Sequence, residues 1–104
     1  METPFRKGIS VRDVVPAYAT HPGEILRDEL EARNISQNQL AKMIDRPQQW
    51  VNSIVTGKRG INATTALLLE KALDIDAVFW VRLQGSYELD LVRIAQRDGM
   101  QAAA

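Results

Sequence analysis

The sequence predicts a single all-α domain built from five helices. Apolar residues recur at helical spacing almost throughout the chain from Pro22 onward, and helix-start signals divide that pattern at short intervals. The length of 104 residues leaves room for one domain, and its content of 45% hydrophobic and 25% charged residues is ordinary for a globular protein. We expect an N-terminal arm over residues 1–20, a helical domain over residues 21–98 and a frayed tail over residues 99–104.

The arm shows no helical period, because Pro4, Gly8 and Pro16 interrupt its scattered apolar residues. Two alternatives stay open for it, a short strand over residues 9–15 and a mobile segment.

The first helix is expected to begin at Pro22 and to run to about Arg33. Proline suits the first helical position, and Glu24 complements the positive end of the helix dipole. Asn34 is a plausible left-handed residue at the C-terminal end. His21 is interpreted as part of this helix start rather than as a catalytic residue.

Two short helices are predicted next. Ser36 and Gln39 have the capping-box spacing and open a helix that ends near Ile44. Pro47 starts the second short helix, which ends before Gly57.

Two more capping residues predict the last two helices. Asn62 can cap a fourth helix, and Asp76 a fifth that starts at about Ala77. We expect the fifth helix to run to about Arg97, with Gly85 as a weak point.

The two short helices and the connection over residues 45–47 have the geometry of a helix-turn-helix. Ala41 supplies the small residue that such a unit needs where its helices touch. Apolar side chains would lock the two helices together, namely Leu40, Ile44, Val51 and Ile54.

The outer face of the second short helix is polar. Glutamine and asparagine can pair bidentately with adenine, and serine can bond to several bases, so this face suits the major groove of double-stranded DNA. Its residues are Gln48, Gln49, Asn52 and Ser53. Gln37 can meet a phosphate at a helix N-terminus. The helix is flanked by cations that could bind the DNA phosphates and so position the protein on the duplex, namely Arg46, Lys58 and Arg59.

Charge supports this interpretation by its distribution rather than by its total. Thirteen basic and thirteen acidic residues give no net charge, which weakens any prediction of unselective nucleic-acid coating. Within residues 36–62, however, there are four basic residues and one acidic residue, Asp45. Any helical bundle carries polar outer faces, so spacing alone leaves a purely structural role open.

The residues of this region resemble a known family. Residues 35–41 followed by residues 48–58 resemble the helix-turn-helix of the phage-repressor/Cro (XRE) family. More specifically, four segments around that motif resemble the HigA-type antitoxins of the HigA/VapI subgroup, namely residues 21–26, 57–61, 65–67 and 79–80. The resemblance covers roughly residues 20–94 and implies a repressor-like fold.

The resemblance implies a sequence-specific DNA-binding antitoxin of a type II toxin–antitoxin system in the bacterial cytoplasm. Such a protein forms a homodimer, represses its own operon at a palindromic operator and neutralises a HigB-type toxin, an mRNA-cleaving ribonuclease. By position, the residues that contact DNA in the family fall on Gln37, Gln48, Gln49, Asn52 and Ser53.

Two residues depart from the family's pattern. Asp45 stands where the turn usually has glycine, so we expect a left-handed backbone there, which aspartate tolerates at some cost. Trp50 stands where a small polar residue is usual. Its indole either contacts DNA, at the sugar–phosphate backbone or a thymine methyl, or covers the first helix of the motif.

The fifth helix carries an apolar stripe at spacings of three and four residues, formed by Trp80, Leu83, Tyr87, Leu91 and Ile94. A palindromic operator requires a two-fold dimer. We expect Phe79, Trp80 and Leu83 to pack inward, and Tyr87, Leu91 and Ile94 to form the dimer interface.

Several function classes are excluded or weakened by composition. The absence of cysteine and the single histidine speak against a thiolate or histidine-rich metal site, and no cofactor is implied. We find no set of nucleophile, base and oxyanion donors and therefore predict no enzyme. No apolar run approaches the ~18 residues of a membrane span, and no signal-peptide segment follows the N-terminus.

Two alternatives to the antitoxin remain: a stand-alone helix-turn-helix repressor without a toxin, and a protein-interaction module whose helix-turn-helix is only structural. Glu24, Asp28 and Glu31 share one helical face, as metal or acid–base sites can, but the neighbouring Arg27 favours a solvated charged face.

Overall fold

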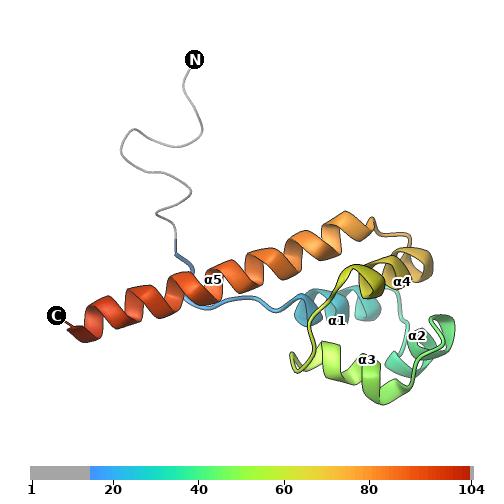
Figure 1. Ribbon diagram of the computed structural model, residues 1–104. Helices are drawn as coiled ribbons and strands as arrows, with labels where there is room; N and C mark the ends of the chain where they lie inside the picture. The colour runs from blue at the N-terminus through green and yellow to red at the C-terminus, as the bar shows by residue number, and fades with distance from the viewer. Residues whose placement is uncertain (1–14, 104) are drawn as a thin grey trace. The chain divides into compact units, whose positions relative to one another are not determined.

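The computed structural model describes residues 15–103, and this part of the chain contains five α-helices and no strand (Figure 1). They are α1 (Pro22–Ala32), α2 (Gln37–Met43), α3 (Gln48–Val55), α4 (Ala63–Leu73) and α5 (Ala77–Ala103). The predicted all-α class and helix order are confirmed. α5 runs through Gly85 without a break. It also continues beyond its predicted end near Arg97, through Gly99 to Ala103. The strand considered over residues 9–15 lies outside the described residues except for Val15. Of the arm over residues 1–20, residues 1–14 also lie outside the described residues, and residues 15–20 contain no helix or strand.

The described chain falls into two compact units. The first comprises residues 20–87, with α1 to α4 and the beginning of α5, and the second comprises residues 15–19 together with residues 88–103.

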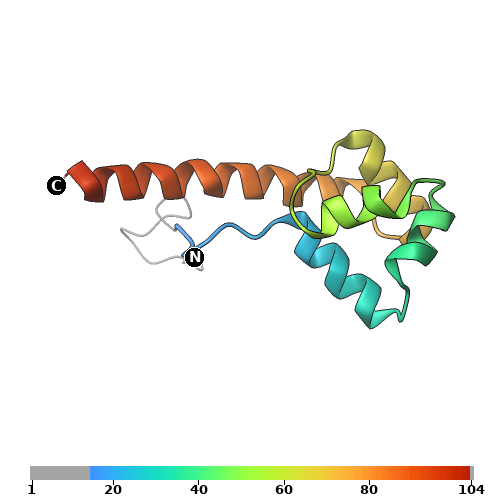
Figure 2. The ribbon, with the colours of Figure 1, turned by 90° about the horizontal axis from the view of Figure 1, so that it is seen from below.

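The first unit is built around one apolar core. α3 packs against both α1 and α2 (Figures 1 and 2). The core takes its side chains from all five helices, from the C-cap residue of α2 and from the loop before α4. It comprises Leu26, Leu30, Leu40, Ala41, Ile44, Val51, Ile54, Ile61, Ala66, Leu69, Leu73 and Trp80. Each of these residues is at most 5% exposed, so their burial supplies the main driving force for folding. The residues predicted to lock the helix-turn-helix all belong to this core.

One core prediction is wrong. Phe79 was expected to pack inward but is 42% exposed, whereas its neighbour Trp80 is fully buried. Successive helical residues point about 100° apart, so two adjacent large rings cannot both enter a small core from one helix. Leu83, one turn after Trp80, is half-buried and packs against the core as predicted.

Four of the five predicted helix starts, all except that of α3, are confirmed by side-chain cap hydrogen bonds. The Nδ1 atom of His21 accepts from the Gly23 amide at 2.8 Å, and Glu24 accepts from the His21 amide at 3.1 Å. Ser36 and Gln39 form a second reciprocal capping box in front of α2. Asn62 accepts from the Thr65 amide in α4, and Asp76 accepts from the Val78 amide in α5.

Gly23 lets α1 approach α3 closely. A Cβ atom at this position would overlap the carbonyl oxygen of Ile54 near the end of α3. The His21–Gly23 segment therefore does two things at once: it caps α1 and seats it on α3.

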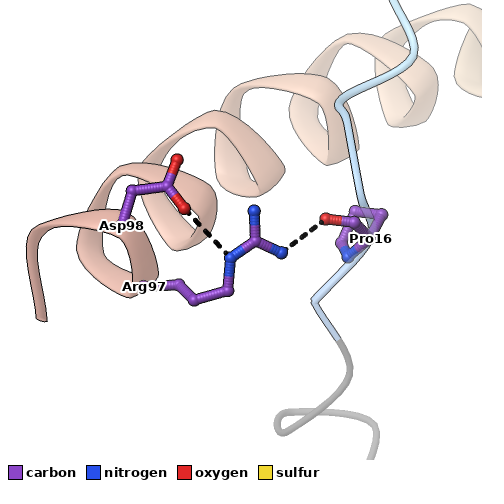
Figure 3. Close-up of polar contacts among 3 residues, drawn as sticks. All are labelled: Pro16, Arg97 and Asp98. Carbon is purple, nitrogen blue, oxygen red and sulfur yellow. Dashed lines mark hydrogen bonds and ion pairs between the residues drawn. The ribbon is translucent and has the colours of Figure 1, made fainter. Parts of the chain in front are cut away.

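The second unit holds its N-terminal segment through Arg97. The Nη1 atom of Arg97 donates to the Pro16 carbonyl oxygen at 3.1 Å, and its Nε atom donates to Asp98 at 3.2 Å (Figure 3). One guanidinium group thus joins residues 15–19 to the C-terminal part of α5.

Candidate nucleic-acid interface

The turn between α2 and α3 brings the two helices of the motif together. Asp45 has a φ of 54°, so the left-handed backbone predicted at this position is confirmed. The Arg46 amide then donates to the Ala41 carbonyl oxygen at 3.0 Å. Ala41 is 3% exposed, which agrees with its predicted place at the helix contact. Pro47 precedes α3 as its N-cap and turns the chain into the second helix.

The polar residues predicted to read bases lie on α3 with different exposures. Gln48 and Gln49 are the first two residues of the helix, and both are exposed. Asn52 is exposed one turn later, and Ser53 is half-buried. Because three of the four side chains are open to solvent, this face of α3 can offer amide donors and acceptors to a ligand.

Gln37 and Asn52 meet across the two helices of the motif. The Nδ2 atom of Asn52 donates to the Oε1 atom of Gln37 at 3.1 Å. Gln37 is the first residue of α2, where the helix dipole favours an anion. This bond orients both side chains. The Oδ1 atom of Asn52 and the Nε2 atom of Gln37 are not used in it and can still bond to a ligand.

The serine of this face has a different role from the amides. Its hydroxyl donates to the Trp50 carbonyl oxygen at 2.6 Å and accepts from the Nε atom of Arg59 at 3.2 Å. Its own carbonyl oxygen accepts from the amides of Lys58 and Arg59. Ser53 therefore fixes the loop after α3, in addition to any contact with a base.

Gly57 permits that loop to fold back. Its φ of 82° lies in the left-handed region, and its amide donates to the Ile54 carbonyl oxygen at 3.0 Å. Lys58 and Arg59 follow and are both exposed. These two residues, which were predicted to bind DNA phosphates, thus lie beside the C-terminal end of α3. Arg46, predicted for the same role, is exposed beside its N-terminal end.

Trp50 packs as the second of its two alternatives expected, against the body of the domain, while its contact with DNA stays a prediction. It is half-buried and packs against the core. Two guanidinium groups also lie over its ring, with the Arg46 Cζ atom 5.8 Å and the Arg59 Cζ atom 5.7 Å from the ring centroid. Three predicted site residues therefore form one cluster at the edge of the motif.

Sequence reasoning missed the residues that complete the surroundings of this cluster. A hollow of about 280 Å³ beside Trp50 is lined further by Gly60, Asn62, Thr64, Thr65 and Leu68. Asn62 was predicted only as a helix cap. No sequence signal placed the other residues beside Trp50, because the fold alone brings α4 beside the end of α3.

The residues predicted for the dimer interface fall in both units. Tyr87, in the first unit, is half-buried and packs its ring edge-on against His21 at a centroid distance of 4.8 Å. In the second unit, Leu91 is 45% exposed and Ile94 is half-buried. Leu89 and Val92 are exposed beside them on α5. The interface itself stays a prediction.

His21 is set in a desolvated position at the start of α1. It is 8% exposed, and burial lowers its pKa below the usual 6.5, while the charge of Glu24 acts in the opposite direction. The neutral imidazole is the form that accepts from the Gly23 amide. His21 is thus a structural residue of the helix start, as predicted.

Two of the three acidic residues expected on a solvated face of α1 are exposed. These are Asp28 and Glu31, and the Nε atom of Arg27 lies 3.9 Å from the Oδ1 atom of Asp28. Glu24 differs, because it is half-buried and accepts from the His21 amide in the capping box. Residues 15–103 contain no cluster of acidic and histidine side chains arranged to hold a metal ion. None of the helices described here is long and apolar enough to cross a membrane.

Comparison with known proteins relates this arrangement to one family. The family described as Helix-turn-helix matches residues 26–80, which include the whole of α2 to α4. Virulence-associated protein I of Dichelobacter nodosus is 41% identical over 81 residues, which are 77% of this chain and 72% of that protein.

Solved structures with the same fold carry functional descriptions. An addiction module antidote protein of the HigA family from Coxiella burnetii is 35% identical, with a TM-score of 0.72 over 84% of this chain and 96% of its own. The Pseudomonas aeruginosa antitoxin HigA, solved with the higBA promoter, is 38% identical, with a TM-score of 0.71 over 83% of this chain and 95% of its own. The predicted resemblance to HigA-type antitoxins is confirmed.

Proposed function

Because this chain belongs to the helix-turn-helix family, we propose that it is a sequence-specific DNA-binding antitoxin that represses its own operon and neutralises a HigB-type toxin. The observation that carries the proposal is the exposed amide face of α3, which is flanked at both ends by basic residues. The Pseudomonas aeruginosa antitoxin HigA, 38% identical, was solved with the higBA promoter, which supports the same kind of ligand here.

Base reading falls to the α3 amides in this proposal. Gln48, Gln49 and Asn52 would enter the major groove, where each good bidentate pair contributes about 1–3 kcal/mol of discrimination. Ser53 would add a base contact only through a hydroxyl that already holds Arg59. Gln37 would bind a phosphate at the start of α2 and orient Asn52 through their shared hydrogen bond.

Phosphate contacts would set the register on the duplex. Arg46 lies before α3, and Lys58 and Arg59 lie after it, so the cations bracket the helix that enters the groove. Such contacts are independent of base sequence and make affinity fall with salt.

A homodimer would present two copies of α3 to successive major grooves, about 34 Å apart. Its proposed interface comprises Tyr87, Leu91 and Ile94. The exposed apolar residues Leu89 and Val92 support an interface on α5, because exposed apolar patches mark protein contacts.

The DNA part of the proposal is tested with the double variant Gln48→Ala/Gln49→Ala. Both side chains are exposed, so the fold should keep its melting temperature. The variant is expected to lose preference for the DNA upstream of its own gene over a scrambled duplex, while keeping most of its salt-dependent affinity. An unchanged preference would contradict base reading by α3.

The antitoxin part needs a separate experiment. The chain is co-expressed with the product of the reading frame next to its gene, and mRNA cleavage and co-purification are measured. We expect a stable complex that blocks cleavage, with Gln48→Ala/Gln49→Ala blocking it as well as the parent chain does. A partner without RNA-cleaving activity, or no partner, would instead favour the stand-alone repressor.

A further inference from the structure

Two arginines from opposite ends of α3 converge on one indole ring. Arg46 comes from the turn before the helix and Arg59 from the loop after it, and both guanidinium carbons lie within 6 Å of the Trp50 ring centroid. A cation over the face of an indole ring is attracted by the ring's electrons, which biases the orientation of a flexible side chain.

Each arginine is held a second time by a hydrogen bond. The Nε atom of Arg59 donates to the Ser53 hydroxyl at 3.2 Å, and the Nη1 atom of Arg46 donates to the Asp45 carbonyl oxygen at 3.0 Å. A guanidinium group has five N–H donors, so these bonds leave most of the donors of both groups for a ligand.

The hollow beside this pair is suited to a small anion. It is lined by both arginines, by Trp50 and by neutral residues of the α3–α4 loop and of α4, and none of its lining residues is acidic. Its volume of about 280 Å³ falls just below the ~300–1,000 Å³ of pockets that hold drug-sized ligands.

We infer that this hollow binds one phosphate group of the operator's sugar–phosphate backbone, and that Trp50 is a positioning residue that directs both guanidinium groups toward it. The inference rests on the proposed function, because segments that flank a recognition helix meet the DNA backbone when the helix lies in the major groove. Guanidinium forks match phosphate oxygens. Trp50 thus acts on DNA through its arginines rather than through a base.

Tryptophan fluorescence tests the anion site without DNA. The chain has two tryptophans, and Trp80 is fully buried, so quenchers in solution report on Trp50. We expect iodide, an anion, to quench Trp50 more than neutral acrylamide does, and Arg46→Gln/Arg59→Gln to lose that excess. Lys71→Gln removes an exposed cation of α4 outside the hollow and should keep the excess. Equal excess in all three proteins would overturn the anion site.

The salt dependence of DNA binding tests whether the two arginines share a phosphate. The slope of log K against log salt becomes shallower by about 1 for each phosphate that the protein no longer neutralises. With one shared phosphate per protomer, Arg46→Gln/Arg59→Gln should reduce the slope of the dimer by about 2. A reduction of about 4 would assign each arginine its own phosphate and overturn the shared site.

Variants at position 50 test the positioning role. Trp50→Leu keeps an apolar side chain against the core but removes the ring, and Trp50→Phe restores a ring. We expect the slope of log K against log salt to become shallower in the leucine variant, as in the arginine variant, and to stay unchanged in the phenylalanine variant. Melting temperatures check that each variant is folded. Equal slopes for Trp50→Leu and the parent chain would overturn the positioning role.

The two levels of failure are distinguishable. If the parent chain binds its upstream DNA no better than a scrambled duplex, the proposed function fails, and the quenching experiment alone still decides whether the hollow attracts anions. If specific binding is present but the slope is insensitive to both arginines, the inference fails and the proposed function stands.

Discussion

The side-chain amide of Asn52 in α3 donates to the side-chain oxygen of Gln37 in α2 at a distance of 3.1 Å. These two residues lie on different helices of the motif, and both are predicted to face DNA. Their hydrogen bond couples the helix expected to rest on the backbone to the helix expected to read bases, so a change in one should be felt in the contacts of the other.

Gln37→Ala should therefore weaken operator binding without unfolding the domain. The loss of one hydrogen bond is worth about 1 kcal/mol per protomer, or on the order of 30-fold in Kd for two half-sites. Asn38→Ala, at the exposed next position of α2, serves as the matched control and should bind as the parent chain does. Anisotropy titrations compare the three proteins. Equal affinities would mean that the Gln37–Asn52 contact has no part in recognition.

His21 makes stability depend on pH. Burial lowers the pKa of His21 below 6.5, so the unfolded chain binds more protons than the folded one near that pH. The stabilisation by the neutral imidazole is therefore complete above about pH 6.5 and is lost as the pH falls from there toward the lowered value. Urea unfolding at pH 5 and pH 8 measures this loss of stability.

The matched control for this prediction is His21→Asn. Asparagine is a good N-cap with an oxygen acceptor and does not titrate. The parent chain should lose more stability than this variant between pH 8 and pH 5. An identical loss in both would show that His21 is not the titrating group.

Two glycines should respond to alanine in opposite directions. At Gly23 the new Cβ atom would overlap the Ile54 carbonyl oxygen, so Gly23→Ala should cost about 1–3 kcal/mol or more. At Gly85, inside α5, nothing lies within 4 Å, so Gly85→Ala should stabilise by about 0.5–1 kcal/mol through helix propensity. Thermal unfolding measures both. Equal melting temperatures would contradict the close approach of α1 to α3.

Arg97→Gln should disturb only the second unit. Removal of the guanidinium group breaks the bond to the Pro16 carbonyl oxygen, so amide chemical shifts should change in residues 15–19 and in the neighbouring turn of α5. Residues 20–87 should keep their shifts. Arg82→Gln, an exposed position of α5 in the first unit, should leave residues 15–19 unaffected. Unchanged shifts at residues 15–19 in Arg97→Gln would show that the contact is not formed in solution.

Local signals carried most of the fold. Caps act within three residues of themselves, so the capping box of Ser36 with Gln39 was visible in the sequence and is confirmed by its two hydrogen bonds. The left-handed Asn34 was likewise found from residue type and position, and the left-handed Asp45 from the glycine that the resembled family usually has at that position. The left-handed Asp74 at the end of α4 was missed, because aspartate there gives no stronger signal than at ordinary loop positions.

Contacts between distant residues could not be predicted in the same way. The Ile61 amide donates to the Gln84 side chain at 2.8 Å, and the Ala77 amide donates to Glu70 at 2.7 Å, although neither pair forms a sequence motif. The arginine pair over Trp50 is of the same kind. Its members were each predicted as DNA contacts, but their assembly into one cluster depends on how the loop after α3 folds back.

The most direct test of the central claim is fluorescence anisotropy of the purified chain on the DNA upstream of its gene and on a scrambled duplex of equal length, at two salt concentrations. A sequence-specific dimeric repressor should bind the upstream DNA preferentially, with log K falling against log salt at a slope of roughly −3 to −5. Equal binding to both duplexes, or a slope near zero, would contradict DNA recognition by this helix-turn-helix.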